Sequence, residues 1–233
     1  MVTTPIRVRA GGRLSLTNCW IRVNVTDDGV GMIGKAGRVE LTHVVVDGSG
    51  FAGAPVGVTL AGGGRVAFSE FVGTTQNVRV ERGAATIEWN YVHDAKARTI
   101  SGDAHSYGFT VSAGGPVTIA HNWVDMSRAE GIGTGISVVS DTGPIDGVRI
   151  EGNTLLPGGS YSLYVRTDGY CRCGGVANVR VLDNHWYADA THPWAGRYGV
   201  HAVNDDDSVT AWSGNVLTRD SATVPVTFGD TRP

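Results

Sequence analysis

The chain has 233 residues, with 34 glycines, 18% charged residues and a formal net charge of −3. This balance, with a pI near 6.1, excludes the basic surface that nucleic-acid phosphates require, and no apolar stretch is long enough to span a membrane as a helix. Glycine at about twice its usual frequency indicates many tight turns.

The N-terminal segment begins Met1-Val-Thr-Thr-Pro5 and shows no signal peptide, since it lacks a charged region, an apolar region and a cleavage site. We therefore expect a cytoplasmic protein or a fragment of a larger exported one, unless the chain belongs to a virus particle. The first repeat has no amphipathic helix before it. Because an open stack of strands exposes its end, we expect a partner or an oligomer axis, such as that of a homotrimer, to cover it.

A frame of alternating apolar residues followed by one further inward position recurs eight times along the chain, starting near residues 13, 38, 65, 85, 116, 147, 178 and 209. In the first three copies we assign that position to Cys19, Val44 and Phe71. In the last five it is asparagine, with steps of 32, 31, 31 and 31 residues between Asn90, Asn122, Asn153, Asn184 and Asn215. A period of this size predicts stacked repeats, and its continuity predicts one domain over residues 1–233.

A second apolar column follows each frame, with two inward residues flanking an outward one. Its members are Val58 and Leu60, Val78 and Val80, Phe109 and Val111, Ile136 and Val138, Leu163 and Val165, and Val200 and Ala202. This alternation is typical of strands. Short strands that pair with their equivalents one repeat later bury a continuous core, so we predict an all-β fold, a parallel β-helix of about eight coils with almost no helix.

The asparagines are assigned a structural role. Inward amides at a fixed corner can hydrogen-bond along the stack and tolerate unusual backbone angles.

The longest insertion, 19 residues, follows Asn90 and is rich in ionisable groups. Such a loop on a rigid scaffold is a common place for function. One interpretation is a polysaccharide site, in which a histidine acts as base, an aspartate orients it, and Lys96 or an arginine neutralises a uronate. The other interpretation is a solvated loop without a site. The candidate catalytic residues are His93, Asp94, Arg98, Asp103 and His105, and Tyr107 is added as a substrate-binding candidate.

The second long insertion, 16 residues, follows Asn184 and combines aromatic and polar residues. Trp186 falls in an inward position and is assigned to the core. Trp194, Arg197 and Tyr198 are candidates for binding a sugar, whose faces stack on rings, or for a subunit interface.

Outward residues of the second column form a third candidate surface, because equivalent positions align along the stack and could contact successive units of a polymer. The alternative is ordinary solvent exposure. The substrate-binding candidates here are Arg79, Glu81, Tyr164, Arg166 and His201. Calcium, which a lyase could use, would need several aspartates on this face, and they are missing; Asp205, Asp206 and Asp207 are interpreted as a turn.

The three cysteines predict neither a disulfide framework nor a metal site. Cys19 is assigned to the core, and Cys171 and Cys173 form a C-x-C pair without further ligands. We expect no cofactor.

The frames TIEWNYVHD, VTIAHNWVDM, VRIEGNTLLPGG and VRVLDNHWYAD, with SGDAHSYGFTVSAGG between the first two, resemble right-handed parallel β-helix proteins related in fold to pectate lyases. The resemblance is to an unclassified group common in actinobacteria and among minor tail proteins of their phages. It implies a right-handed single-stranded coil and a link to polysaccharides. It carries over no catalytic set, and His105, in a D-x-H loop, is the one candidate that it supports.

Three functions follow as hypotheses. The first is a carbohydrate-recognising tail or spike module that contacts host-surface glycans. The second is a polysaccharide lyase, with His105 and Arg98 as base and cation, or a glycoside hydrolase with Asp94 and Asp103 as its carboxylates. The third is a structural spacer.

Overall fold

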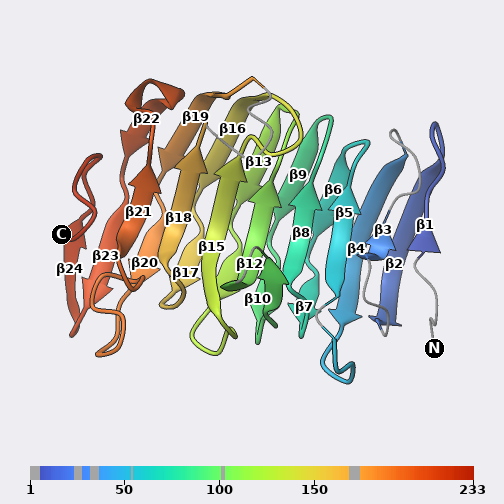
Figure 1. The fold of residues 1–233 in the computed structure, drawn as a ribbon, viewed down its shortest axis with the longest axis horizontal. Helices are drawn as coiled ribbons and strands as arrows, with labels where there is room; N and C mark the ends of the chain where they lie inside the picture. Colours follow the sequence, from blue (N-terminus) through green and yellow to red (C-terminus); the bar gives the residue numbers. More distant parts are fainter. Residues whose placement is uncertain (1–5, 24–27, 32–36, 54, 101–102, 168–173) are drawn as a thin grey trace.

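The protein is an all-β solenoid of parallel strands, shown as a computed structural model in Figure 1. The structure describes residues 6–23, 28–31, 37–53, 55–100, 103–167 and 174–233. Among these residues the only helical element is a 3₁₀ turn, η1 (Asp206–Ser208), so the predicted absence of helix and the predicted turn at Asp205–Asp207 are both confirmed.

One face of the solenoid is a nine-stranded sheet. Eight of its strands follow one another in sequence order, and all are parallel, so the chain makes seven turns from the first to the last. They are β1 (Ile6–Arg7), β3 (Asp28–Gly31), β5 (Val56–Leu60), β8 (Gln76–Val80), β12 (Asp103–Val111), β15 (Ile132–Val139), β18 (Tyr161–Arg166) and β21 (Gly199–Val203). The ninth strand, β11 (Arg98–Ile100), pairs antiparallel with β12.

The other face is a fifteen-stranded sheet that bends along its length into two ladders. The first ladder contains β2 (Arg13–Arg22), β4 (Arg38–Asp47), β6 (Gly64–Ala67), β9 (Ala85–Glu88), β13 (Val117–Ala120), β16 (Ile145–Glu151), β19 (Val176–Leu182) and β22 (Val209–Ser213). The second contains β7 (Glu70–Val72), β10 (Tyr91–His93), β14 (Trp123–Asp125), β17 (Thr154–Leu156), β20 (His185–Tyr187), β23 (Val216–Arg219) and β24 (Ala222–Pro225). The long strand β4 pairs with both β6 and β7 and so joins the two ladders.

The core lies between the two sheets and consists of columns of like side chains. Ile87, Ile119 and Ile150 occupy the same register position in successive coils and are almost completely buried. Stacking one branched residue on another removes apolar surface from water at every coil. Trp186 also lies in the core, as predicted.

The two ladders meet at what we call the asparagine corner, formed by Asn90, Asn122, Asn153, Asn184 and Asn215, all of them buried. Each amide nitrogen from Asn90 to Asn184 donates to the Oδ1 of the next asparagine at 2.9–3.0 Å. It also donates to a main-chain carbonyl of the preceding coil. The same Oδ1 accepts from the backbone N–H of the preceding asparagine, so every polar atom of these amides is used.

The structure corrects two details of the predicted corner. The residue with the left-handed backbone is the one before each asparagine, for example Trp89 (φ 56°) and His121 (φ 56°), and none of the five asparagines has positive φ. In the third coil the corner position is held by Ser69 rather than Phe71, because Phe71 pairs with Val92, and Ser69 N–H donates to Asn90 Oδ1. Phe68 consequently points outward.

The C-terminal residues fold over the last coil. Strand β24 pairs antiparallel with β23, Trp212 Nε1 donates to the Val226 carbonyl at 2.7 Å, and Phe228 packs on Trp212. This segment shields apolar side chains of the final coil from water.

Replacing Asn153 by alanine is expected to lower the free energy of unfolding by about 3–5 kcal/mol, because four buried hydrogen bonds of its side chain disappear. Urea unfolding followed by circular dichroism measures the loss. The control is Thr118→Ala on an outward position of β13, which should cost under about 1 kcal/mol. Equal losses in the two variants would show that the ladder contributes no specific stability.

Candidate functional site

Outward side chains of the nine-stranded sheet form rows that run along the solenoid. Val78, Phe109, Ile136 and Leu163 point into the core and are paired in register. The next residue in each strand therefore points out. This outward row consists of Arg79, Thr110, Ser137 and Tyr164.

A groove of about 800 Å³ lies over these rows. A parallel row formed by Gln76, Tyr107, Thr134 and Tyr161 lies along one side, and Ser112, Val139 and Arg166 line the other. Further lining side chains come from His105, Asp141 and Tyr198. The candidates Arg79, His105, Tyr107, Tyr164, Arg166 and Tyr198 thus lie together in one groove.

Tyrosine rings gather at the C-terminal half of this groove. Tyr161 lies parallel to Tyr164, with ring centroids 6.2 Å apart, and its ring is tilted against that of Tyr198 at 5.8 Å. Such rings combine apolar faces with polar edges, which is the pairing of surfaces that a sugar ring requires.

The charged end of the groove contains an ion pair between Arg79 and Glu81 at 2.9 Å. Arg79 Nε and Thr110 Oγ1 are buried, and among the described residues neither has a hydrogen-bond partner. Buried polar atoms are normally paired, so the polar groups along this row are not fully satisfied by the protein itself.

His105 lies at the edge of the same groove. It is directly opposite Arg98 in the antiparallel pair of β11 and β12, and its Nδ1 lies 3.2 Å from the Tyr107 hydroxyl. Asp103 begins β12, but its side chain lies outside the described part of the chain. Three predicted residues therefore share this edge: Arg98, His105 and Tyr107.

His93 and Asp94 lie instead at β10, on the fifteen-stranded sheet. His93 Nδ1 is 2.6 Å from Asp94 Oδ2, and its Nε2 is 3.1 Å from Glu70 Oε1. Burial lowers the pKa of His93, but the hydrogen bonds to Asp94 and Glu70 outweigh it and raise the pKa above its ordinary value. No described contact joins this cluster to His105.

Lys96, an alternative cation for a uronate, has a structural role. Its ammonium group donates to the carbonyl oxygens of Gly48, Ser49 and Phe51. Because all three of its donors serve the loop after β4, we exclude Lys96 from the candidate site.

The Asn184 insertion contributes one residue to the groove, Tyr198. The Arg197 guanidinium lies 5.4 Å from the centre of the Tyr198 ring. Trp194 instead packs under Arg232 of the C-terminal segment, at 4.8 Å, and does not line the groove.

The prediction that His201 faces outward is wrong. Leu163 pairs with His201 and Val165 with Val203, so these two residues continue the inward column in β21. Val200 is also buried, as predicted, whereas Ala202 pairs with the outward Tyr164. His201 is only 1% exposed and packs against Trp212 and Phe228. Its burial lowers the pKa to about 4, which leaves the ring neutral at pH 7.

Tyr161, Thr134 and Gln76 are groove residues that the sequence interpretation missed. Only outward positions beside the second apolar column were considered there, whereas these residues lie one row earlier, in register with Tyr107. The available signal was the recurrence of a polar or aromatic residue two positions before Val78, Phe109, Ile136 and Leu163.

Comparison with protein-family models, with curated proteins and with solved structures gave no match for this chain. Within the described residues, no group of three or more His, Cys, Asp or Glu side chains is arranged to hold a metal ion, and no helix there is long and apolar enough to cross a membrane. Cys19 is a free, partly buried cysteine, whereas Cys171 and Cys173 lie outside the described residues.

The buried His201 predicts acid sensitivity. Its folded pKa of about 4 lies below the ordinary 6.5, so the unfolded state binds the proton first, and stability falls as the pH drops from about 6.5 towards 4. The full loss is about 3 kcal/mol. Urea unfolding at several pH values should show a flatter pH dependence for His201→Leu than for the unsubstituted protein. Parallel pH profiles would contradict the assignment.

Proposed function

We propose that this protein is a carbohydrate-recognising solenoid that binds an extended, acidic polysaccharide along the groove of the nine-stranded sheet. The observation that carries the proposal is the alignment of Tyr107, Tyr161 and Tyr164 with Arg79 and Arg166 in a single groove. Tyrosines offer faces for sugar rings, and guanidinium groups offer the paired donors that suit carboxylates.

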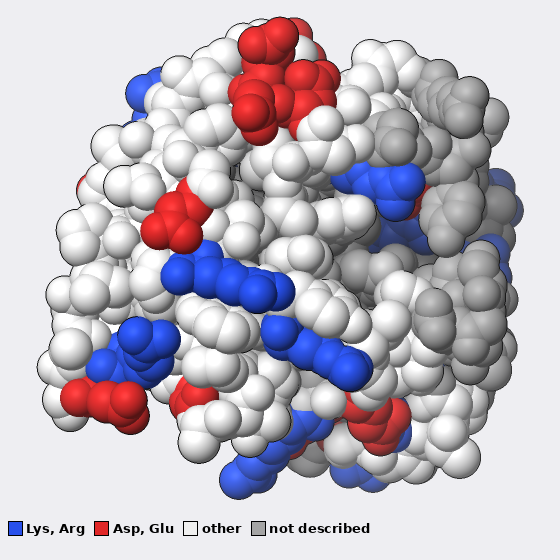
Figure 2. All heavy atoms as spheres, turned by 60° about the vertical axis from the view of Figure 1, so that its left-hand side comes forward, with Lys and Arg blue, Asp and Glu red and all other residues white. Residues whose placement is uncertain are grey.

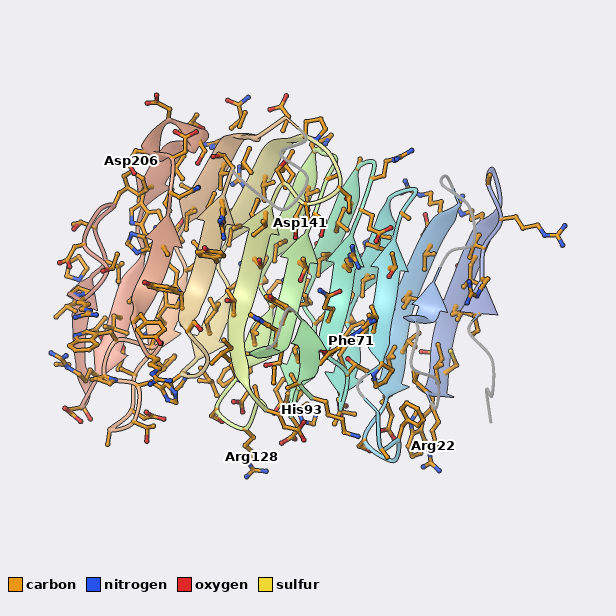
Figure 3. The ribbon with its side chains drawn as sticks, in the orientation of Figure 1. Arg22, Phe71, His93, Arg128, Asp141 and Asp206 are labelled. Atoms are coloured by element: carbon orange, nitrogen blue, oxygen red, sulfur yellow. The ribbon has the colours of Figure 1, made fainter. Side chains whose placement is uncertain are left out.

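The shape of the groove supports a polymer rather than a compact ligand. Its rows run from coil to coil at the strand spacing, about 4.8 Å, and so place one outward side chain beside each successive unit of an extended chain. The described lining contains two arginines and one carboxylate, Asp141, and Glu81 pairs with Arg79 from beside the lining. The preference that we propose for an anionic ligand therefore rests on the donors of the guanidinium groups rather than on net charge. Figure 2 shows that acidic side chains gather elsewhere, at the upper edge of the C-terminal end, where Figure 3 places Asp206.

The biological setting that we propose is recognition of host-surface glycans by a virion tail or spike. It is supported by the resemblance of the asparagine-containing frames to those of β-helix tail proteins, and a homotrimer is the corresponding assembly.

A lyase that acts in the same groove is the second candidate. It is favoured by the position of His105, which lines the groove and lies opposite Arg98 in the β11–β12 pair. A base and a cation at one edge are the groups that β-elimination from a uronate requires.

Binding of acidic oligosaccharides tests the proposal. Isothermal titration with oligogalacturonate and oligoalginate should give heat for the unsubstituted protein, and Tyr164→Ala and Arg166→Gln should each weaken the Kd about tenfold, the equivalent of about 1.4 kcal/mol. The matched control is Arg149→Gln, on the opposite sheet and paired with Glu151, which should bind normally. Affinity should also fall as salt is added.

The same mixtures distinguish binding from cleavage. A lyase would form an unsaturated uronate, which is detected by its absorbance, and His105→Ala should abolish this product. Oligosaccharides that stay intact would identify a binding module without lyase activity. Absence of heat with every acidic glycan tested would overturn the proposed function.

A further inference from the structure

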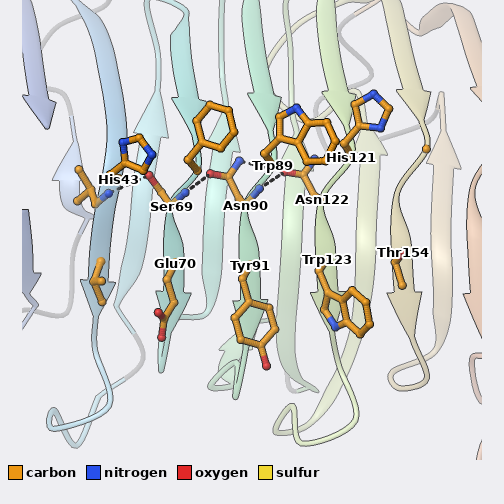
Figure 4. Close-up of a pocket in the computed structure, with 14 residues that line it drawn as sticks. His43, Ser69, Glu70, Trp89, Asn90, Tyr91, His121, Asn122, Trp123 and Thr154 are labelled. Carbon is orange, nitrogen blue, oxygen red and sulfur yellow. Dashed lines mark hydrogen bonds between the residues drawn. The ribbon is translucent and has the colours of Figure 1, made fainter. Parts of the chain in front are cut away.

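A second groove runs along the outside of the asparagine corner, with one wall of aromatic rings and a second wall that includes Tyr91 and Trp123 (Figure 4). One wall consists of His43, Phe68, Trp89 and His121, which precede the corner position in four successive coils. The other consists of the residues that follow the corner position, which are Val45, Glu70, Tyr91, Trp123 and Thr154. It crosses five coils and lies on the fifteen-stranded sheet.

The corner geometry explains why one wall is continuous. Each of its four residues has the left-handed backbone, with φ between 50° and 56°, while the next residue turns inward. Their side chains therefore point away from the core. Neighbouring rings are nearly parallel, with centroids 5.3 Å apart for His43 and Phe68, 6.5 Å for Phe68 and Trp89, and 4.6 Å for Trp89 and His121.

These rings are unusually exposed for aromatic side chains. Trp89 is 52% exposed, Trp123 47%, Phe68 46% and Tyr91 40%. A left-handed backbone also strains residues other than glycine and asparagine, and neither Phe68 nor Trp89 recovers that cost by burial. A contiguous exposed apolar strip on a folded chain is typical of a binding surface.

The floor of the groove cannot supply hydrogen bonds to a ligand. Asn90 and Asn122 use every polar atom of their amides within the ladder. A ligand must therefore bind mainly through contact with the rings, with hydrogen bonds at the margins. The polar groups of the margins are the imidazoles of His43 and His121, the carboxylate of Glu70, the hydroxyls of Tyr91 and Thr154 and the indole N–H groups of Trp89 and Trp123.

The charge of the lining restricts the ligand further. Among the described lining residues there is no arginine or lysine, and the one carboxylate, Glu70, faces His93. The guanidinium of Arg65 lies 6.0 Å from the Phe68 ring centre. Burial raises the pKa of Tyr91. The carboxylates Asp125, Asp94 and Glu70 raise it further, and Arg128 acts in the opposite direction, so acidic groups outnumber basic ones around this ring. Uronates and nucleic-acid phosphates are disfavoured at such a surface, in contrast to the groove that contains Arg79 and Arg166.

We infer that the corner groove is a second, separate carbohydrate site, which takes a neutral, extended polysaccharide of β-1,4-linked pyranoses. Where the units are glucose or N-acetylglucosamine the ring substituents are equatorial, so each unit exposes a flat apolar face that can lie on an aromatic ring while its hydroxyl groups reach the margins. Rings repeated at the strand spacing, about 4.8 Å, match a ligand that repeats along a line. This inference does not rest on the proposed function of the other groove.

Titration with cellohexaose and chitohexaose tests the inference, monitored by calorimetry and by tryptophan fluorescence. The unsubstituted protein should bind at least one of them with a change in emission. Trp89→Asn, which keeps a residue tolerant of the left-handed backbone, and Trp123→Ala should each weaken the Kd about tenfold. Trp194→Ala is the matched control: Trp194 packs under Arg232 and lines neither groove, so its loss should leave the Kd unchanged.

Two readouts separate this site from the other groove and from self-association. Trp89→Asn and Trp123→Ala should bind acidic oligosaccharides as the unsubstituted protein does. If the unsubstituted protein binds neither neutral hexasaccharide, or if both corner variants bind them normally, the inference is wrong. It is also wrong if light scattering shows a dimer that Trp89→Asn dissociates, because the occupant of the groove would then be a second copy of the chain.

Discussion

The buried amide ladder at the asparagine corner is the constraint on which the other features depend. An asparagine amide in the core must have all its hydrogen bonds satisfied, and here the partners are the same amide one coil later and the main chain one coil earlier. This arrangement fixes the register between coils to a single residue. It also requires a sharp turn, which the preceding residue makes with a left-handed backbone.

Both grooves follow from that register. Because each coil is aligned with the next, residues at one position form a row, and a row of outward residues becomes a linear surface. On the nine-stranded sheet the rows combine tyrosine, hydroxyl and arginine side chains. At the corner, the positions beside Asn90 and Asn122 contain Trp89, Tyr91, His121 and Trp123. The scaffold therefore makes both surfaces linear, and the outward residues give each of them its own chemistry.

The sequence predicts the fold well because the core and corner repeat at one period. Stacked coils, short parallel strands and the core positions of Ile87, Ile119 and Ile150 follow from pattern alone. The errors arise where the repeat is degenerate. The third coil has Ser69 at the corner, a hydroxyl that still accepts from Val44 N–H, and no pattern of apolar residues distinguishes it from Phe71 two positions later.

The candidate site is predicted less completely, for two physical reasons. In β21 the residues that continue the inward column are His201 and Val203 rather than Ala202, which is why His201 was expected on the surface although it is buried against Trp212. The repeat period also does not show where the two ends of an insertion lie. The Asn90 insertion begins on one sheet and ends on the other, so His93 and His105 lie on different sheets. The aromatic residues of the corner groove were recognisable in the sequence, because Trp89 and Trp123 directly flank corner asparagines. They were overlooked because the repeat was defined by its inward residues alone.

Two linear grooves of different charge on one rod have a consequence for binding strength. On our proposals each groove alone would contact a few units of a polymer, and ring contacts of this kind contribute about 1 kcal/mol each. A surface that displays both an acidic and a neutral glycan could be held at both grooves, so that the second contact forms at a high effective concentration. The two grooves lie on one continuous core of stacked columns with no hinge between them. We therefore attribute any gain in overall affinity to avidity, and expect binding at one groove to leave the intrinsic affinity of the other unchanged.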